Sequence, residues 1–152
     1  ALHQVIQAAF GWEDYHLHEF IFGKDRYAPP GPASEMGFDE TLSTTGVRLS
    51  DAHIGSKPFR YIYDFGDDWQ HLITVEESAS TDTTMTPICI DGANACPPED
   101  VGGPPGFMNL VEAMSDPKHE EHADRMRWHG ERFDPKRFNR GAVNRRLKKI
   151  SR

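Results

Sequence analysis

Residues 61–76, with the sequence YIYDFGDDWQHLITVE, limit most strongly what this chain can fold into. Aromatic and aliphatic residues precede the polar turn DFGDDW, and a second apolar stretch follows it. This pattern predicts two antiparallel strands, over 59–63 and 72–76, joined by an acidic turn. We expect Gly66 to provide the positive φ that a tight turn needs.

Helices are predicted before and after this hairpin. Asp134 followed by Pro135 is typical of a helix start. Residues 15–22 alternate well enough for a further strand. Apolar residues at helical spacing predict helices over 2–10, 107–114, 119–128 and 143–150. The order helix, strands, helices predicts an α+β fold in which an antiparallel sheet packs with several helices.

The length of 152 residues suits one domain that spans residues 1–152. The chain begins at Ala1, already within a helical pattern, so we expect upstream residues to be missing.

Two cysteines, Cys89 and Cys96, are too few for a secreted disulfide framework, which favours a cytoplasmic location. No apolar run is long enough to span a bilayer, so we expect no membrane partner.

The acidic turn is the first candidate binding site. Its members are Asp64, Asp67, Asp68, Trp69 and His71. Crowded carboxylates are tolerated when they are solvated, when they accept backbone N–H groups in turns, or when a cation neutralises them. A capped structural hairpin is the favoured interpretation, and a site for a divalent metal is the alternative.

Two further candidate sites contain histidine or carboxylate side chains. An H-x-H pattern on a strand would place His16 and His18 on one face, which suits a divalent metal but is weak evidence alone. Glu99 and Asp100 could act as an acid–base pair or could cap a helix. No complete catalytic constellation is present, so enzymatic activity stays open. No metal ligand set is assigned, and a divalent cofactor is possible but not favoured.

The C-terminal segment has the opposite charge to the rest of the chain. The formal net charge is −7, whereas residues 136–152 hold eight basic residues and no acidic one. Residues 1–135 therefore hold 9 basic and 24 acidic residues, a charge of −15. The tail could pair with the acidic body or bind an anion such as nucleic acid. The candidate nucleic-acid contacts are Arg145, Arg146, Lys148 and Lys149.

Several separated segments together resemble one known family. They are FGWEDYHLHEF (10–20), YIYDFGDDWQHLITVE (61–76), CIDGANACPPEDVGGPPGF (89–107) and FDPKRFN (133–139) with the following VN (143–144). The chain resembles the plasmid pRiA4b ORF-three-like family, also described as passenger proteins of an insertion-sequence element.

The resemblance implies a compact α+β domain from bacteria, archaea and their mobile elements, with no established activity. Members usually begin with a strand upstream of the first helix. Many relatives have cysteine where this chain has Val101, so a metal held by the family's cysteines would lack one ligand here. The family's marked positions correspond to His16, His18, Asp64, Gly66, Asp67, Asp68, Trp69, His71, Pro97, Pro98, Glu99, Asp100, Gly102 and Gly103.

Two hypotheses follow. The first is a non-enzymatic module that binds an unknown protein or nucleic acid and is linked to mobile DNA through a plasmid or transposon. The second is a metal-dependent hydrolase or nuclease that uses Asp64, Asp67 and Asp68. The second requires the PPED segment to lie against the DFGDDW turn.

Overall fold

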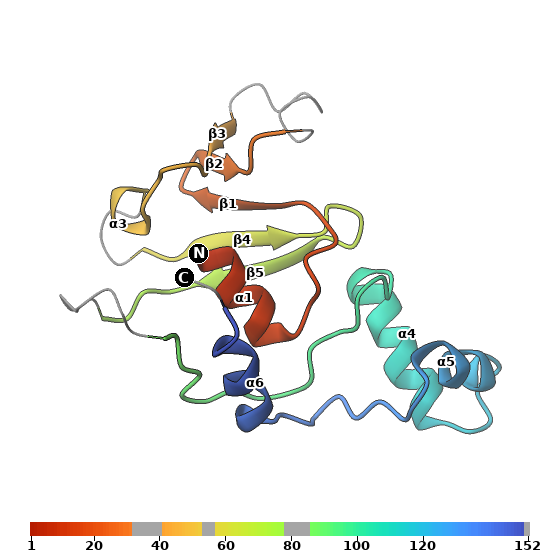
Figure 1. Cartoon of the computed structure of the whole chain (residues 1–152). Helices are drawn as coiled ribbons and strands as arrows, with labels where there is room; N and C mark the ends of the chain where they lie inside the picture. The colour runs from red at the N-terminus through yellow and green to blue at the C-terminus, as the bar shows by residue number, and fades with distance from the viewer. Residues whose placement is uncertain (32–40, 53–56, 78–85, 151–152) are drawn as a thin grey trace. The chain divides into compact units, whose positions relative to one another are not determined.

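The computed structural model describes residues 1–31, 41–52, 57–77 and 86–150 (Figure 1). The chain forms two compact units. The helical unit comprises residues 1–14 and 81–152, and the sheet unit comprises residues 15–80. The described residues contain five helices and five strands, which confirms the α+β prediction.

The sheet unit is built around one five-stranded sheet with the order β3-β2-β1-β4-β5. Its neighbouring strands pair antiparallel, except that β2 and β3 are parallel, so the sheet is mixed rather than purely antiparallel. A short helix, α3, lies between β3 and β4 in the sequence. The bounds are His18–Phe22 (β1), Asp25–Ala28 (β2), Thr41–Ser43 (β3), Leu49–Ala52 (α3), Phe59–Tyr63 (β4) and Trp69–Ile73 (β5).

The predicted hairpin is formed by β4 and β5. Strand β4 has the predicted bounds, but β5 begins at Trp69 rather than at residue 72. The N–H of Asp68 donates to the carbonyl of Asp64 at 2.6 Å and closes the turn. Strand pairing therefore resumes at once, with Tyr63 opposite Trp69.

Aromatic side chains make up much of the buried part of the sheet unit. Phe20 of β1 lies opposite Tyr61 of β4, and their ring centroids are 5.0 Å apart. Phe22 stacks on Phe59 at 4.4 Å. Because alternate strand residues share a face, these rings line one side of the sheet. Tyr61 and Tyr63 are completely buried.

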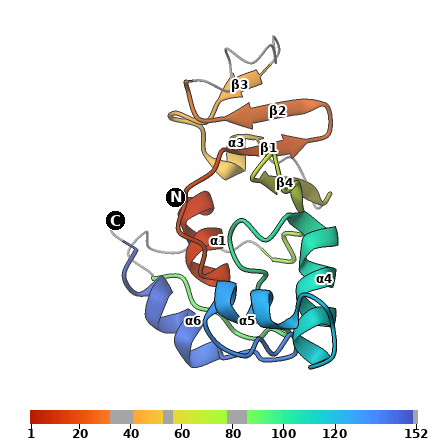
Figure 2. The same cartoon turned by 90° about the vertical axis from the view of Figure 1, so that its right-hand side faces the viewer.

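The helical unit contains two helix pairs: α1 contacts α6, and α4 contacts α5 (Figure 2). None of the described helices has the length and apolar character needed to cross a membrane. The bounds are Leu2–Phe10 (α1), Gly103–Ser115 (α4), His122–His129 (α5) and Arg140–Leu147 (α6). The buried apolar residues of this unit are Trp12, Val101, Leu110, Ala113, Met114, Val143 and Leu147.

The helix start predicted at Asp134 is wrong. The carboxylate of Asp134 accepts the N–H of Lys136 and forms only a turn. The N-cap of α6 lies five residues later, where the side chain of Asn139 accepts the N–H of Ala142 at 2.9 Å. Both Asp and Asn are good N-cap residues, so local sequence could not distinguish the two positions.

Candidate functional site

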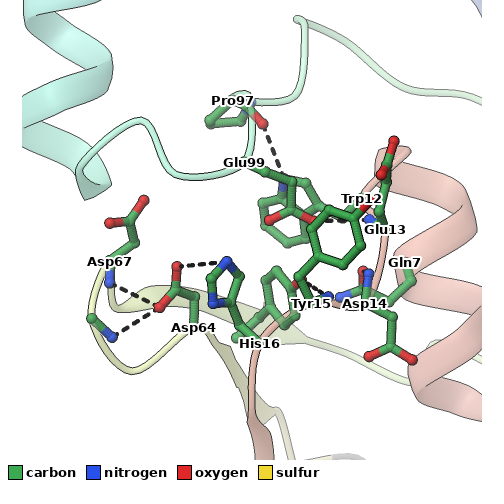
Figure 3. Close-up of polar contacts among 12 residues, drawn as sticks. Gln7, Trp12, Glu13, Asp14, Tyr15, His16, Asp64, Asp67, Pro97 and Glu99 are labelled. Atoms are coloured by element: carbon green, nitrogen blue, oxygen red, sulfur yellow. Dashed lines mark hydrogen bonds and ion pairs between the residues drawn. The ribbon is translucent and has the colours of Figure 1, made fainter.

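The carboxylate of Asp64 organises the acidic turn of the sheet unit. Its Oδ1 atom accepts the N–H of Gly66 at 2.9 Å and that of Asp67 at 3.2 Å (Figure 3). Asp64 is only 7% exposed. A buried carboxylate needs such donors, and backbone N–H groups in a turn supply them without a cation. The favoured interpretation, a capped hairpin, thus describes this part of the turn.

The backbone of the turn explains why aspartate occurs at two of its positions. Asp64 has φ 56° and Asp68 has φ 54°, whereas Gly66 is not among the residues with positive φ. The expectation that Gly66 provides the left-handed conformation is therefore wrong. Aspartate and asparagine tolerate this region better than other residues with a β-carbon. Asp100, a candidate in the helical unit, also has positive φ, at 56°.

His16 lies beside Asp64 within the sheet unit. The distance from His16 Nε2 to Asp64 Oδ2 is 3.6 Å (Figure 3). The imidazole also meets the ring of Tyr63 edge-on, with centroids 5.8 Å apart. The Tyr63 hydroxyl in turn accepts the N–H of Tyr15 at 3.1 Å. This is a partly exposed histidine–carboxylate pair held by an aromatic neighbour.

His18 has a different environment from His16. Strand β1 begins at His18, so His16 lies outside the strand and the expected H-x-H pair on one strand is not formed. His18 is buried, and its ring lies 5.9 Å from the rings of both Phe20 and Tyr61. These ring contacts are those of an aromatic core.

The other turn candidates belong to β5 or to its approach. His71 lies opposite Tyr61, and its Nδ1 is 3.3 Å from the Tyr61 carbonyl oxygen. Burial lowers the pKa of His71 below its ordinary value. Trp69 is half-buried, and exposed Asp68 accepts a hydrogen bond from Gln70 at 2.8 Å.

In the helical unit the PPED segment holds the chain that follows α1. The indole Nε1 of Trp12 donates to the carbonyl of Pro97 at 3.0 Å (Figure 3). The Glu99 carboxylate accepts the N–H of Glu13 at 2.8 Å. These bonds join residues 85 and 86 positions apart in the sequence, so the PPED segment stabilises a long-range contact. Asp100 is exposed.

A close backbone approach follows PPED. A β-carbon on Gly106 would lie 2.0 Å from the Val101 carbonyl oxygen, so only glycine fits there. The side chain of Val101 is 4% exposed and belongs to the core. At this position, where many relatives are expected to have cysteine, the chain has an apolar packing residue.

Both cysteines are free thiols in the helical unit. Burial, followed by the nearby Glu99 carboxylate, raises the pKa of Cys96 to about 12. Since the thiolate is the nucleophile and the metal-binding form, Cys96 is poorly suited to either role at neutral pH.

One of the four basic candidates has a defined intramolecular position. The guanidinium of Arg146 donates to the carbonyls of Ala8 at 2.7 Å and Ala9 at 2.9 Å, in the last turn of α1. Gly11, with φ 90°, ends that helix, and a β-carbon there would lie 3.2 Å from the Arg146 Cζ atom. A cation at a helix C-terminus satisfies carbonyls that lack helical partners. The other three candidates are exposed: Arg145, Lys148 and Lys149.

Sequence reasoning missed Asn144, although the VN pair was part of the family resemblance. Its side-chain Oδ1 accepts the N–H of Cys89 at 2.8 Å, and its Nδ2 donates to the Cys89 carbonyl at 3.0 Å. An amide has the donor and acceptor needed for this double contact. No local pattern indicates which backbone segment an amide side chain will meet, and these two residues are 55 positions apart.

Two pairs of possible metal donors lie within single units. His16 lies beside Asp64, and His3 Nε2 is 2.6 Å from Asp14 Oδ1. Burial lowers the pKa of His3, against the opposing effect of Asp14.

A family model and a curated relative both match most of this chain. A family model described as "Plasmid pRiA4b ORF-3-like protein" matches residues 1–142. The "Uncharacterized protein y4hQ" of Sinorhizobium fredii (strain NBRC 101917 / NGR234) is 41% identical over 131 residues. That alignment covers 85% of this chain and 66% of the relative, so the chain spans just under two thirds of the relative's length.

A solved structure has a similar fold. The crystal structure of MM3350, a protein of unknown function from Methanosarcina mazei Go1, matches with a TM-score of 0.70 and 35% sequence identity. The match covers 91% of this chain and 79% of that chain. Neither relative is described with an activity, so the functional argument rests on the residues of this chain.

Proposed function

The chain belongs to the plasmid pRiA4b ORF-3-like family. We propose that it is a non-enzymatic cytoplasmic binding module that contacts DNA of a plasmid or another mobile element. The observation on which the proposal rests is the basic surface at the C-terminal end of α6 and the turn that follows it. Arg145, Lys148 and Lys149 are exposed, and in the described part of the chain none of them forms an ion pair.

The burial pattern of α6 supports this assignment. Val143 and Leu147 are buried, and Arg146 binds the end of α1, so these residues fix one side of the helix. The three exposed cations are left to solvent on an otherwise acidic protein. Each lysine or arginine that meets a phosphate displaces counterions and adds salt-dependent affinity.

The hydrolase alternative has less support. Asp64 Oδ1 already accepts two backbone N–H groups, and Glu99 accepts the N–H of Glu13. Asp64 and Asp68 also occupy left-handed backbone positions, a structural reason for aspartate there. Isothermal titration with Mg²⁺, Mn²⁺ and Zn²⁺ tests this alternative. Stoichiometric binding that Asp64→Asn abolishes without unfolding the protein would favour the hydrolase.

Fluorescence anisotropy with a labelled DNA duplex tests the main proposal. We expect binding that weakens with salt. The variant R145Q/K148Q/K149Q should bind at least about tenfold more weakly at low salt, with a log–log salt slope lower by up to about 2.7. The control K24Q/K118Q/R132Q removes the same number of exposed charges elsewhere and should bind like the wild type. Equal loss in both triple variants, or no binding by the wild type, contradicts the proposal.

A further inference from the structure

We propose that the backbone of residues 88–90 is a docking edge. An extended segment of a partner protein would bind along it through backbone hydrogen bonds. The partner segment is apolar and has carboxylate side chains. This inference concerns protein recognition and goes beyond the proposed contact with DNA. It begins from the double contact between Asn144 and Cys89.

The Asn144 amide holds one edge of this segment as a neighbouring strand would. In an antiparallel pair, one residue exchanges both its N–H and its C=O with the residue opposite. Cys89 exchanges both groups with the Asn144 side chain, at 2.8 and 3.0 Å. Arg140 adds a third contact, from its Nη1 to the Ile90 carbonyl at 3.0 Å. Residues 88–90 are thus fixed without belonging to any strand of the sheet.

The other edge of the segment is open at Ile88, whereas the Ile90 carbonyl on that edge already accepts a hydrogen bond from Arg140. In an extended chain the backbone groups of successive residues point to opposite sides, so those of Ile88 point away from Asn144. Within the described residues, neither the N–H nor the C=O of Ile88 forms a hydrogen bond. Open strand-like edges of this kind are templates for pairing with another chain.

The side chains on this edge are apolar and solvent-exposed. Ile88 is 68% exposed and Ile90 is 81% exposed, the highest value among the large apolar residues that the structure describes. They alternate with half-buried Cys89. In recognition by strand addition, main-chain hydrogen bonds give affinity and alternate side chains give specificity. Two exposed isoleucines two residues apart suit alternating apolar residues in the added segment.

Charge complementarity selects an acidic partner. Arg140, Asn144 and Lys148 are four residues apart along α6 and its C-cap, so they lie in one row. Asn144 binds the backbone of Cys89, and the cations Arg140 and Lys148 lie on either side of Asn144 in this row. Residues 136–152 contain no acidic residue. Carboxylates beside the apolar positions of the partner would therefore meet positive charge at both ends of the docking edge.

A defined peptide tests the proposal. The probe is a fluorescein-labelled peptide of eight residues that alternates Val and Glu, measured by anisotropy. We expect saturable binding that Ile88→Ser with Ile90→Ser weakens at least about tenfold, since both side chains are exposed and the fold should persist. The same peptide with Lys in place of Glu should bind at least about tenfold more weakly. The control is Leu72→Ser on β5, which also replaces an exposed apolar side chain by serine, and it should leave binding unchanged.

N-methylated peptides test the backbone part directly. Methylation of alternate amides on one edge of the peptide should abolish binding, whereas methylation on the other edge should preserve it. Equal binding of both methylated peptides, no binding of the acidic peptide, or unchanged binding by the Ile88/Ile90 double variant overturns the proposal. A concentration-dependent dimer that the double variant abolishes would assign the edge to a second copy of this chain and also overturn it. The double variant should bind duplex DNA normally, so failure here is separate from failure of the DNA proposal.

Discussion

The indole of Trp12 donates to the carbonyl of Pro97 at 3.0 Å, across 85 positions of sequence. Trp12 is 7% exposed, and Pro97 opens the PPED segment. The bond joins the chain that follows α1 to the loop that leads into α4. A segment that looks like a carboxylate site in the sequence is therefore also a structural tie within the helical unit.

Trp12→Phe should lower the free energy of unfolding by about 1–3 kcal/mol, because the Pro97 carbonyl loses its donor in a partly buried position. Urea denaturation followed by circular dichroism measures this change. Tyr15→Phe is the matched control, since the Tyr15 side chain is 68% exposed. Equal stability of Trp12→Phe and the wild type would contradict a structural role for the bond.

Arg146→Ala should destabilise the protein by about 2–3 kcal/mol, because two charge-assisted hydrogen bonds to the carbonyls of α1 are lost. Arg145→Ala, one position earlier, removes the same charge from an exposed side chain and should change stability by less than about 0.5 kcal/mol. Thermal denaturation of both variants makes the comparison. Equal melting temperatures for Arg146→Ala and Arg145→Ala would contradict the role of Arg146 at the end of α1.

Periodic apolar spacing was enough to predict α1, β4 and α6. Charge was not enough to assign the function of Arg146. A solvated arginine and one that binds the end of another helix look alike in sequence, and here the partner carbonyl is 138 positions away. The candidate site could also be predicted only in part. The sequence predicted an acidic turn at residues 64–69. It could not predict the positive φ of Asp64 and Asp68, because that depends on how the turn closes.

Asp64→Asn should retain most of the wild-type stability, since asparagine has the same Oδ1 acceptor and tolerates positive φ. Asp64→Ala should cost about 2–3 kcal/mol, because the N–H groups of Gly66 and Asp67 lose their acceptor and the backbone is strained. Chemical denaturation distinguishes the variants. If asparagine is as damaging as alanine, the negative charge rather than the turn geometry matters at this position.

The stability contribution of His71 should depend on pH. Because burial lowers the pKa of His71 below 6.5, the folded protein binds a proton less readily than the unfolded chain does. The contribution is therefore fully present above about pH 6.5 and is lost as the pH falls through the lower folded pKa. Between pH 7 and 5, His71→Gln should lose less stability than the wild type does. Parallel stability curves for His71→Gln and the wild type between pH 7 and 5 would refute the prediction.

Cys96 should resist alkylation in the folded protein. Its pKa of about 12 leaves very little thiolate at pH 8, so iodoacetamide should label it at least about a hundredfold more slowly than it labels an ordinary free cysteine. Unfolding in guanidinium removes the burial that raises the pKa, and labelling should then become fast. Mass spectrometry of Cys89→Ser, which leaves Cys96 as the single thiol, follows the reaction without interference. Rapid labelling of folded Cys89→Ser would show that the Cys96 thiol is accessible and ionised, contrary to its position in the helical unit.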